Sequence, residues 1–287
     1  DALIAFLKEQ NFKSILSRVE AKHGVGSEDP DTAVPDETEY ELVQDMAALE
    51  KWIDAAAAAG YVAVDTETTS LDANRAELVG ISLSVQPGRA CYIPLAHRSG
   101  DEQAALDLGG SKEKGNGSGK LKQIRMKDAL DALRPLLEGP AVLKIGQNIK
   151  YDSVVLGRHG IDVSPVDDTM LLSFVLDGGA GKHGMDELAD RHLGVQTVKY
   201  KDVVGTGKSQ VTFDYVPLDK ACDYAAEDAD ITLRLHQMLK PRLLSERMVT
   251  VYETIERPLI PVLAALERKG VLVDPAALRA LSRDFAQ

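Results

Sequence analysis

Apolar and polar residues recur along the chain with the periods of helices and strands, most clearly after residue 40. Short apolar runs bounded by turn residues predict five strands, of which the third and fourth form a hairpin: 40–43, 61–66, 78–85, 89–94 and 141–145. Apolar residues spaced three and four apart predict helices between Asp45 and Gly60 and at 127–137, 148–157, 168–176, 185–193 and 218–239. Strands come first, and helices then alternate with strands. We therefore predict an α/β fold, a mixed five-stranded sheet with three antiparallel strands and then parallel strands, flanked by helices.

The pattern changes at both ends of this region, which suggests three parts. Residues 1–36 combine helical apolar spacing with a Gly-, Pro- and acid-rich stretch, and the first residue is Asp rather than Met. We expect them to be a helix and acidic linker left from a preceding domain. Residues 37–243 form the main domain, with a Gly-, Ser- and Lys-rich insertion at 99–120 that we expect to be mobile. Residues 244–287 are helical, and we expect them to lead into a further domain.

Composition excludes several classes of protein. Apolar residues make up 44% of the chain, enough for a core, but no apolar run reaches the roughly 20 residues that span a bilayer. No secretion signal is recognisable, so we expect a cytoplasmic protein without a membrane partner. Cys91 and Cys222 are the only cysteines, which indicates neither a disulfide framework nor a zinc site. The net charge of −12 argues against tight, nonspecific binding of duplex nucleic acid, although bound cations could offset the phosphates of a strand end.

Acidic residues in three distant segments suggest a metal site. Asp65 and Glu67 alternate on a predicted strand, so both point to one face. Asp152 and Asp228 each lie on a predicted helix, four residues after Asn148 and Tyr224 respectively, and therefore on the same face as those residues. Taken singly, each acid could be solvated, Asn148 could be an N-cap and Tyr224 could cover the helix surface. Together, four carboxylates are enough for two divalent cations, and ligand sets of oxygen favour Mg²⁺ or Mn²⁺.

These segments resemble the three motifs of the tyrosine-bearing branch of the DEDD exonucleases. The sequence around these motifs, from about residue 40 to the C-terminus, resembles the 3′-5′ exonuclease (proofreading) domain of bacterial DNA polymerase I. The stretches that carry the likeness are Val64-Asp65-Thr66-Glu67-Thr68, Leu78-Val79-Gly80-Ile81-Ser82, Tyr92-Ile93-Pro94-Leu95-Ala96-His97, Lys144-Ile145-Gly146-Gln147-Asn148-Ile149-Lys150-Tyr151-Asp152 and Tyr224-Ala225-Ala226-Glu227-Asp228-Ala229-Asp230.

The resemblance implies a ribonuclease H-like fold and stepwise hydrolysis of DNA from a 3′ end to 5′-mononucleotides. It implies that Asp65, Glu67 and Asp228 hold the cation that activates water. Asp65 and Asp152 would place a second cation at the leaving 3′ oxygen. Tyr224, together with Glu67, would orient the attacking water.

The implied partners are a single-stranded or frayed 3′ DNA end, the nucleoside monophosphate product and a polymerase domain in cis. Bases would stack on apolar and aromatic side chains, which accept any base. The positions that match DNA contacts of the family are Thr66, Leu71, Gln147, Asn148, Tyr151, Met170 and Tyr200. Core packing is the alternative explanation for Leu71, Tyr151, Met170 and Tyr200.

Two other functions are compatible with the motifs. A ribonuclease D-like exoribonuclease carries the same set of motifs. The sequence around each motif resembles a DNA polymerase, however, and this favours DNA as the substrate. A catalytically silent module that braces a polymerase is the second alternative, and the presence of all four acids and Tyr224 argues against it. No nucleotide-binding or polymerase-metal motif is present, so we predict no polymerase activity.

Overall fold

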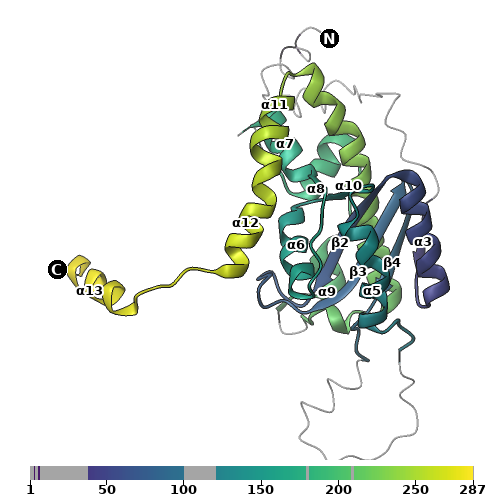
Figure 1. The fold of residues 1–287 in the computed structure, drawn as a ribbon, viewed down its shortest axis with the longest axis horizontal. Coiled ribbons are helices and arrows are strands. Elements are labelled where there is room, and N and C mark those ends of the chain that lie inside the picture. The colour runs from purple at the N-terminus through teal and green to yellow at the C-terminus, as the bar shows by residue number, and fades with distance from the viewer. Residues whose placement is uncertain are drawn as a thin grey trace, which may run out of the picture.

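The computed structural model describes Leu3, Phe6 and residues 38–99, 121–178, 181–207 and 210–286. The helix and linker expected over 1–36 lie outside these residues, apart from Leu3 and Phe6. The insertion expected over 99–120 also lies outside them, apart from its first residue. Figure 1 shows the described part as a sheet covered by helices.

A mixed sheet forms the centre of the fold. Its strands are β1 (Glu39–Leu42), β2 (Tyr61–Thr68), β3 (Leu78–Gln86), β4 (Arg89–Pro94), β5 (Leu143–Gly146) and β6 (Val166–Asp168), in the spatial order β1-β4-β3-β2-β5-β6. The β2, β3 and β4 strands are antiparallel, whereas β1, β5 and β6 join their neighbours in parallel. The predicted mixed α/β sheet is confirmed, with six strands instead of five. Sequence analysis missed β6 because three residues are too few to show a strand period.

Helices cover both faces of this sheet and occupy the C-terminal part of the chain. They are α3 (Met46–Ala59), α5 (Met126–Glu138), α6 (Ile149–Arg158), α7 (Thr169–Asp177), α8 (Met185–Leu188), α9 (Tyr200–Val204), α10 (Leu218–Ser245), α11 (Val249–Val251), α12 (Arg257–Lys269) and α13 (Pro275–Phe285), with π-helical turns at Ala189–Leu193 and Tyr252–Glu256 and a 3₁₀ turn at Phe213–Tyr215. The first of them begins and ends as predicted. The Asp45 side chain accepts a hydrogen bond from Ala48 N, and Gly60 ends the helix with φ 76°.

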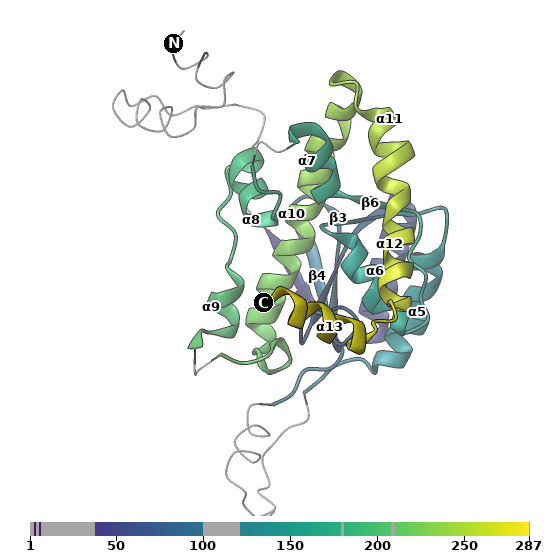
Figure 2. The ribbon, with the colours of Figure 1, turned by 90° about the vertical axis from the view of Figure 1, so that its left-hand side faces the viewer.

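The two faces of the sheet pack against different helices. Figures 1 and 2 show α10 on one side and α3, α5 and α6 on the other. On β2, Val62 and Val64 join the core cluster built with α3, α5 and α6, whereas Ala63 packs with Leu233 of α10. Because side chains alternate along a strand, Asp65 lies on the face that α10 covers.

The segment after α10 packs back onto the main domain. Pro258 stands in the first turn of α12, which follows directly on the preceding π-helical turn. Ile260 and Ala264 of α12 are buried in the same core cluster as α6. Figure 1 shows α13 beyond an extended segment, apart from the sheet. No helix in the described part of the chain has the length and apolar content needed to cross a membrane. The predicted division into three parts stays a prediction.

Candidate active site

Three carboxylates converge at the C-terminal end of β2. Asp65 and Glu67 come from the strand, and Asp228 comes from α10, which crosses the same face of the sheet. One carboxylate oxygen from each residue lies within 4.8 Å of the other two. Glu67 and Asp228 are each 6% exposed, and Asp65 is half-buried. Asp65 and Glu67 thus point to the same side of β2 and share one small space, as the alternation of side chains along a strand predicts.

The fourth carboxylate, Asp152, reaches the same place from α6. It is buried and accepts hydrogen bonds from the backbone N–H of Thr66, at 3.0 Å, and from the Thr66 hydroxyl. Since Thr66 lies between Asp65 and Glu67 on β2, this bond fixes Asp152 beside the strand-borne pair. Thr66, predicted as a DNA contact, lines the pocket, and its side chain also holds this carboxylate.

The electrostatics of the cluster favour a bound cation. Burial raises the pKa of Asp65 to about 6. Burial, and then the repulsion of the neighbouring carboxylates, raises the pKa of Glu67 well above its usual value. Burial and the charge of Asp65 raise the pKa values of Asp152 and Asp228 in the same way. The Glu67 Oε1 atom is buried and has no hydrogen-bond partner among the described residues. A divalent cation would offset the repulsion and occupy that oxygen, and a donor set of carboxylates suits a hard cation.

Tyr224 lies one helical turn before Asp228, so both side chains are on the same face of α10, and the Asp228 charge acts on the Tyr224 hydroxyl. Burial and the nearby carboxylates raise the pKa of Tyr224, so the phenol stays protonated. Its ring packs against Phe213 and Tyr200, with ring centroids 5.9 and 6.0 Å away. Tyr200 and Phe213 stack on each other with an interplanar angle of 9°. These rings hold the Tyr224 hydroxyl toward the acidic cluster.

A pocket of about 980 Å³ opens over these residues. Its lining brings together the catalytic residues and nearly all the DNA contacts expected from the sequence: Asp65, Thr66, Glu67, Leu71, Gln147, Asn148, Tyr151, Asp152, Tyr200, Tyr224 and Asp228. Met170 is the exception. It follows Thr169 at the start of α7, is half-buried, and is not part of this lining.

Residues 40–244 match the family of 3′-5′ exonucleases. The chain belongs to this family. The match covers more than two thirds of the chain, from β1 almost to the end of α10, and so contains every element of the acidic cluster. The family predicted from the motifs is therefore confirmed.

The relatives of this exonuclease-family chain include DNA polymerases I. The one from Rhizobium leguminosarum is 49% identical over 88% of this chain, and the one from Pseudomonas aeruginosa is 40% identical over all of it. The chain spans only 25% and 30% of the lengths of these two relatives. The solved structure of Escherichia coli RNase D superposes with a TM-score of 0.56 and 18% identity, covering 82% of this chain and 52% of that one. This likeness concerns the fold alone, and the ribonuclease H-like architecture predicted from the motifs is confirmed.

Phe213, which packs against Tyr224, also packs against a buried neutral histidine, His97, with ring centroids 5.9 Å apart. His97 is buried, with Nδ1 3.1 Å from the Val216 carbonyl oxygen and Nε2 2.8 Å from the Tyr92 hydroxyl. A carbonyl only accepts, so Nδ1 donates to Val216 and Nε2 accepts from Tyr92. Burial lowers the pKa of His97 to about 4, against the opposing effects of the Val216 bond and the Asp214 charge.

This histidine makes the protein less stable in acid. Between pH 6.5 and about 4 the unfolded chain binds a proton at His97 that the folded chain does not, so stability is full above pH 6.5 and falls as the pH drops toward 4. The free energy of unfolding falls by on the order of 3 kcal/mol across this pH interval. We expect His97→Gln to flatten this part of the pH dependence, measured by urea unfolding between pH 4.5 and 7.5. Equal slopes in the variant and the wild type would contradict the assignment.

Proposed function

We propose that this chain hydrolyses DNA stepwise from the 3′ end, releasing 5′-mononucleotides, as the proofreading part of a DNA polymerase I. One observation carries the proposal: four carboxylates from β2, α6 and α10 meet beside a tyrosine hydroxyl in a single large pocket. Phosphodiester hydrolysis builds negative charge on the phosphate and on the leaving oxygen. Cations held by the four carboxylates would stabilise that charge.

The proposed cofactors are two divalent cations, Mg²⁺ or Mn²⁺. When bound, they would neutralise the phosphate and make a nucleophile of water at neutral pH. Asp65, Glu67 and Asp228 would hold one of them, and Asp65 with Asp152 the other. Tyr224 stays protonated and would orient the attacking water by hydrogen bonding, together with Glu67.

The pocket also offers surfaces for a frayed strand end. Leu71 is 95% exposed and Tyr200 43% exposed, and both line the pocket, so terminal bases could pack on them without regard to identity. Gln147 and Asn148 line the same pocket, where an amide N–H can bind phosphate and sugar oxygens. Met170 is not part of this proposal, because its side chain is not in the lining.

Matched DNA and RNA oligonucleotides test the substrate class. The fold likeness to RNase D makes RNA the informative competitor. We expect a 5′-labelled single-stranded DNA to shorten from its 3′ end with Mg²⁺ or Mn²⁺, and the RNA of the same sequence to shorten more slowly. Faster loss of RNA would support an exoribonuclease instead. Intact DNA and RNA at saturating Mn²⁺ would support a silent module that braces a polymerase.

We further propose that the partner in cis is a polymerase domain, and that the present chain has no polymerase activity. The support is the 25–30% share of two DNA polymerases I that the chain spans. A primer–template with all four deoxynucleotides should therefore be shortened and never extended.

The metal should stabilise the fold. In the metal-free protein the four carboxylates repel one another. A cation whose free concentration is 100 times its dissociation constant adds about 2.7 kcal/mol to the free energy of unfolding. We expect saturating Mn²⁺ to raise the melting temperature by several degrees. Asp152→Asn should blunt this rise, because it removes one charge from the cluster while keeping an acceptor for Thr66. Asp162→Asn, at an exposed site after α6, is the control, and equal rises in both variants would contradict the site.

A further inference from the structure

The segment between β5 and α6 supplies several residues of the pocket. Gln147 and Asn148 line it directly, and Asp152 lies in the first turn of α6. Asn148 has a left-handed backbone, with φ 60° and ψ 44°, and its side chain makes no capping hydrogen bond to the helix that follows. The first N–H groups of α6 must therefore find acceptors elsewhere.

Asp168, at the end of β6, supplies those acceptors. Its Oδ2 accepts from Ile149 N at 2.9 Å, and its Oδ1 accepts from Asn148 N at 3.2 Å. The same carboxylate caps its own helix, α7, by accepting from Met170 N at 2.8 Å and Leu171 N at 3.2 Å. Asp168 is 2% exposed. One buried carboxylate thus fixes the first turns of two helices.

Thr169 strengthens the same junction. Its hydroxyl lies 3.1 Å from the Gly146 carbonyl oxygen and also contacts the side-chain oxygen of Gln147. The β5–β6 pairing sets Gly146 opposite Asp168. A Cβ atom at Gly146 would lie 2.6 Å from the Cβ of Ile149, so the tight approach of this turn requires glycine.

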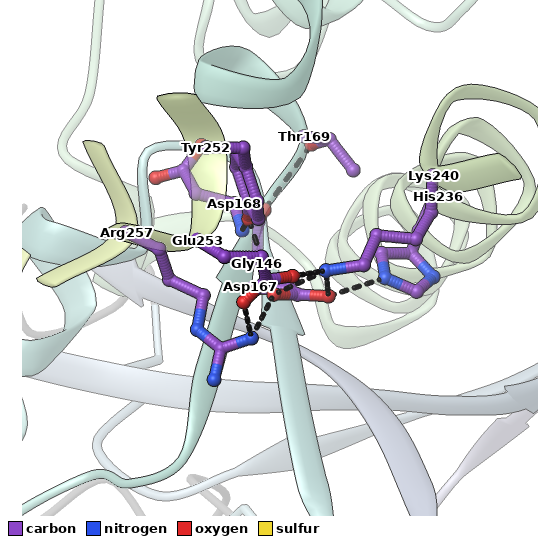
Figure 3. Close-up of polar contacts among 9 residues, drawn as sticks. All are labelled: Gly146, Asp167, Asp168, Thr169, His236, Lys240, Tyr252, Glu253 and Arg257. Atoms are coloured by element: carbon purple, nitrogen blue, oxygen red, sulfur yellow. Dashed lines mark hydrogen bonds and ion pairs between the residues drawn. The ribbon is translucent and has the colours of Figure 1, made fainter. Parts of the chain in front are cut away.

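The C-terminal part of the chain braces Asp168 in turn. Its backbone N–H donates to the Tyr252 hydroxyl at 3.0 Å, and that hydroxyl donates to Asp167 at 3.2 Å. Asp167 is fully buried and is held by His236, Lys240 and Arg257 (Figure 3). These contacts fix the C-terminal end of β6. They thereby fix the backbone that carries the Asp168 carboxylate toward α6.

We propose that Asp168 is a positioning residue for the candidate active site. It sets the start of α6 and thereby places Asp152 beside Asp65 and holds Asn148 at the pocket. The proposal rests on the proposed function, because it assigns Asp152 the role of a metal ligand. Displacement of one ligand by about 1 Å is enough to weaken a site whose ligands must meet at fixed distances.

Asp168→Asn tests this role with little change in shape. The amide keeps one acceptor oxygen, which can cap α7, but turns an N–H₂ group toward a backbone N–H of α6. We expect the amide of Ile149, whose acceptor Oδ2 is the oxygen replaced, to exchange with deuterium about tenfold faster, the loss of roughly one hydrogen bond. We also expect about tenfold weaker Mn²⁺ binding, measured by the paramagnetic resonance of free Mn²⁺.

Asp45→Asn is the matched control, because Asp45 caps α3, a helix that carries no pocket residue. Its Mn²⁺ binding should equal that of the wild type. Unchanged Mn²⁺ binding in folded Asp168→Asn, or equal weakening in Asp45→Asn, would overturn the proposal. If Asp168→Asn does not fold, Thr169→Val tests the same junction. We expect this variant to bind Mn²⁺ about threefold more weakly. Unchanged Mn²⁺ binding would overturn the positioning role of Asp168. Both measurements need no substrate, so they remain readable if the wild type cleaves no DNA and the proposed function fails.

Discussion

Asp228→Ala should lower the rate of 3′-terminal cleavage by about a thousandfold or more. Its carboxylate is one of three with oxygens within 4.8 Å of each other, and it lies one helical turn from Tyr224. Losing it would remove a proposed cation ligand and the negative charge beside the Tyr224 hydroxyl. Cations contribute several kcal/mol to such transition states, and each 1.36 kcal/mol is a factor of ten in rate. Single-turnover cleavage of a labelled single strand at saturating Mn²⁺ measures the effect.

The same variant should keep its fold. Asp228 is one of four acids that repel one another in the metal-free protein, so removing it relieves repulsion while it deletes little core volume. We expect its free energy of unfolding without metal to stay within about 1 kcal/mol of the wild type. Asp223→Ala, at an exposed position of the same helix, should leave both rate and stability unchanged. A rate near that of the wild type in Asp228→Ala would show that the cluster does not perform the chemistry.

Much of the fold could be predicted because its signals are local. The N-cap Asp45, the stop at Gly60 and the hairpin of β3 and β4 each depend on a few neighbouring residues. The β6 strand and the α9 helix were missed. Each is only three to five residues long, and tertiary packing rather than its own sequence holds such a piece in place.

The acidic cluster could also be predicted, since alternation on a strand and a spacing of four on a helix decide which way a side chain points. What supports the cluster could not. Phe213 lies in a segment without periodicity, and its contact with Tyr224 joins residues that only the fold brings together. Asp168 stands where a helix was expected to begin, and nothing local indicates that it also caps a second helix. Asn148, which fits an N-cap by sequence, leaves that role to Asp168 and lines the pocket.

A second buried acid of α10 has a structural role. Asp230 is fully buried and forms a two-pronged ion pair with Arg234, at 3.0 and 2.6 Å. It also accepts hydrogen bonds from Gly88 N at 2.7 Å and from the Tyr40 hydroxyl at 3.0 Å. These bonds tie α10 to the turn between β3 and β4 and to the edge strand β1.

Asp230→Ala should therefore cost about 3–5 kcal/mol, because it leaves the buried Arg234 guanidinium and the Gly88 N–H without their acceptor. For a domain of this size that corresponds to a fall in melting temperature on the order of 10 °C. The double variant Asp230→Leu with Arg234→Met should regain part of the loss, since it leaves no unpaired charge in the core. Chemical unfolding of both variants measures the difference. If the single variant were as stable as the double one, the cost would come from lost packing and not from the stranded guanidinium. Because Asp230 does not line the pocket, cleavage by the folded fraction should persist in both, which separates this acid from Asp228 two residues earlier on the same helix.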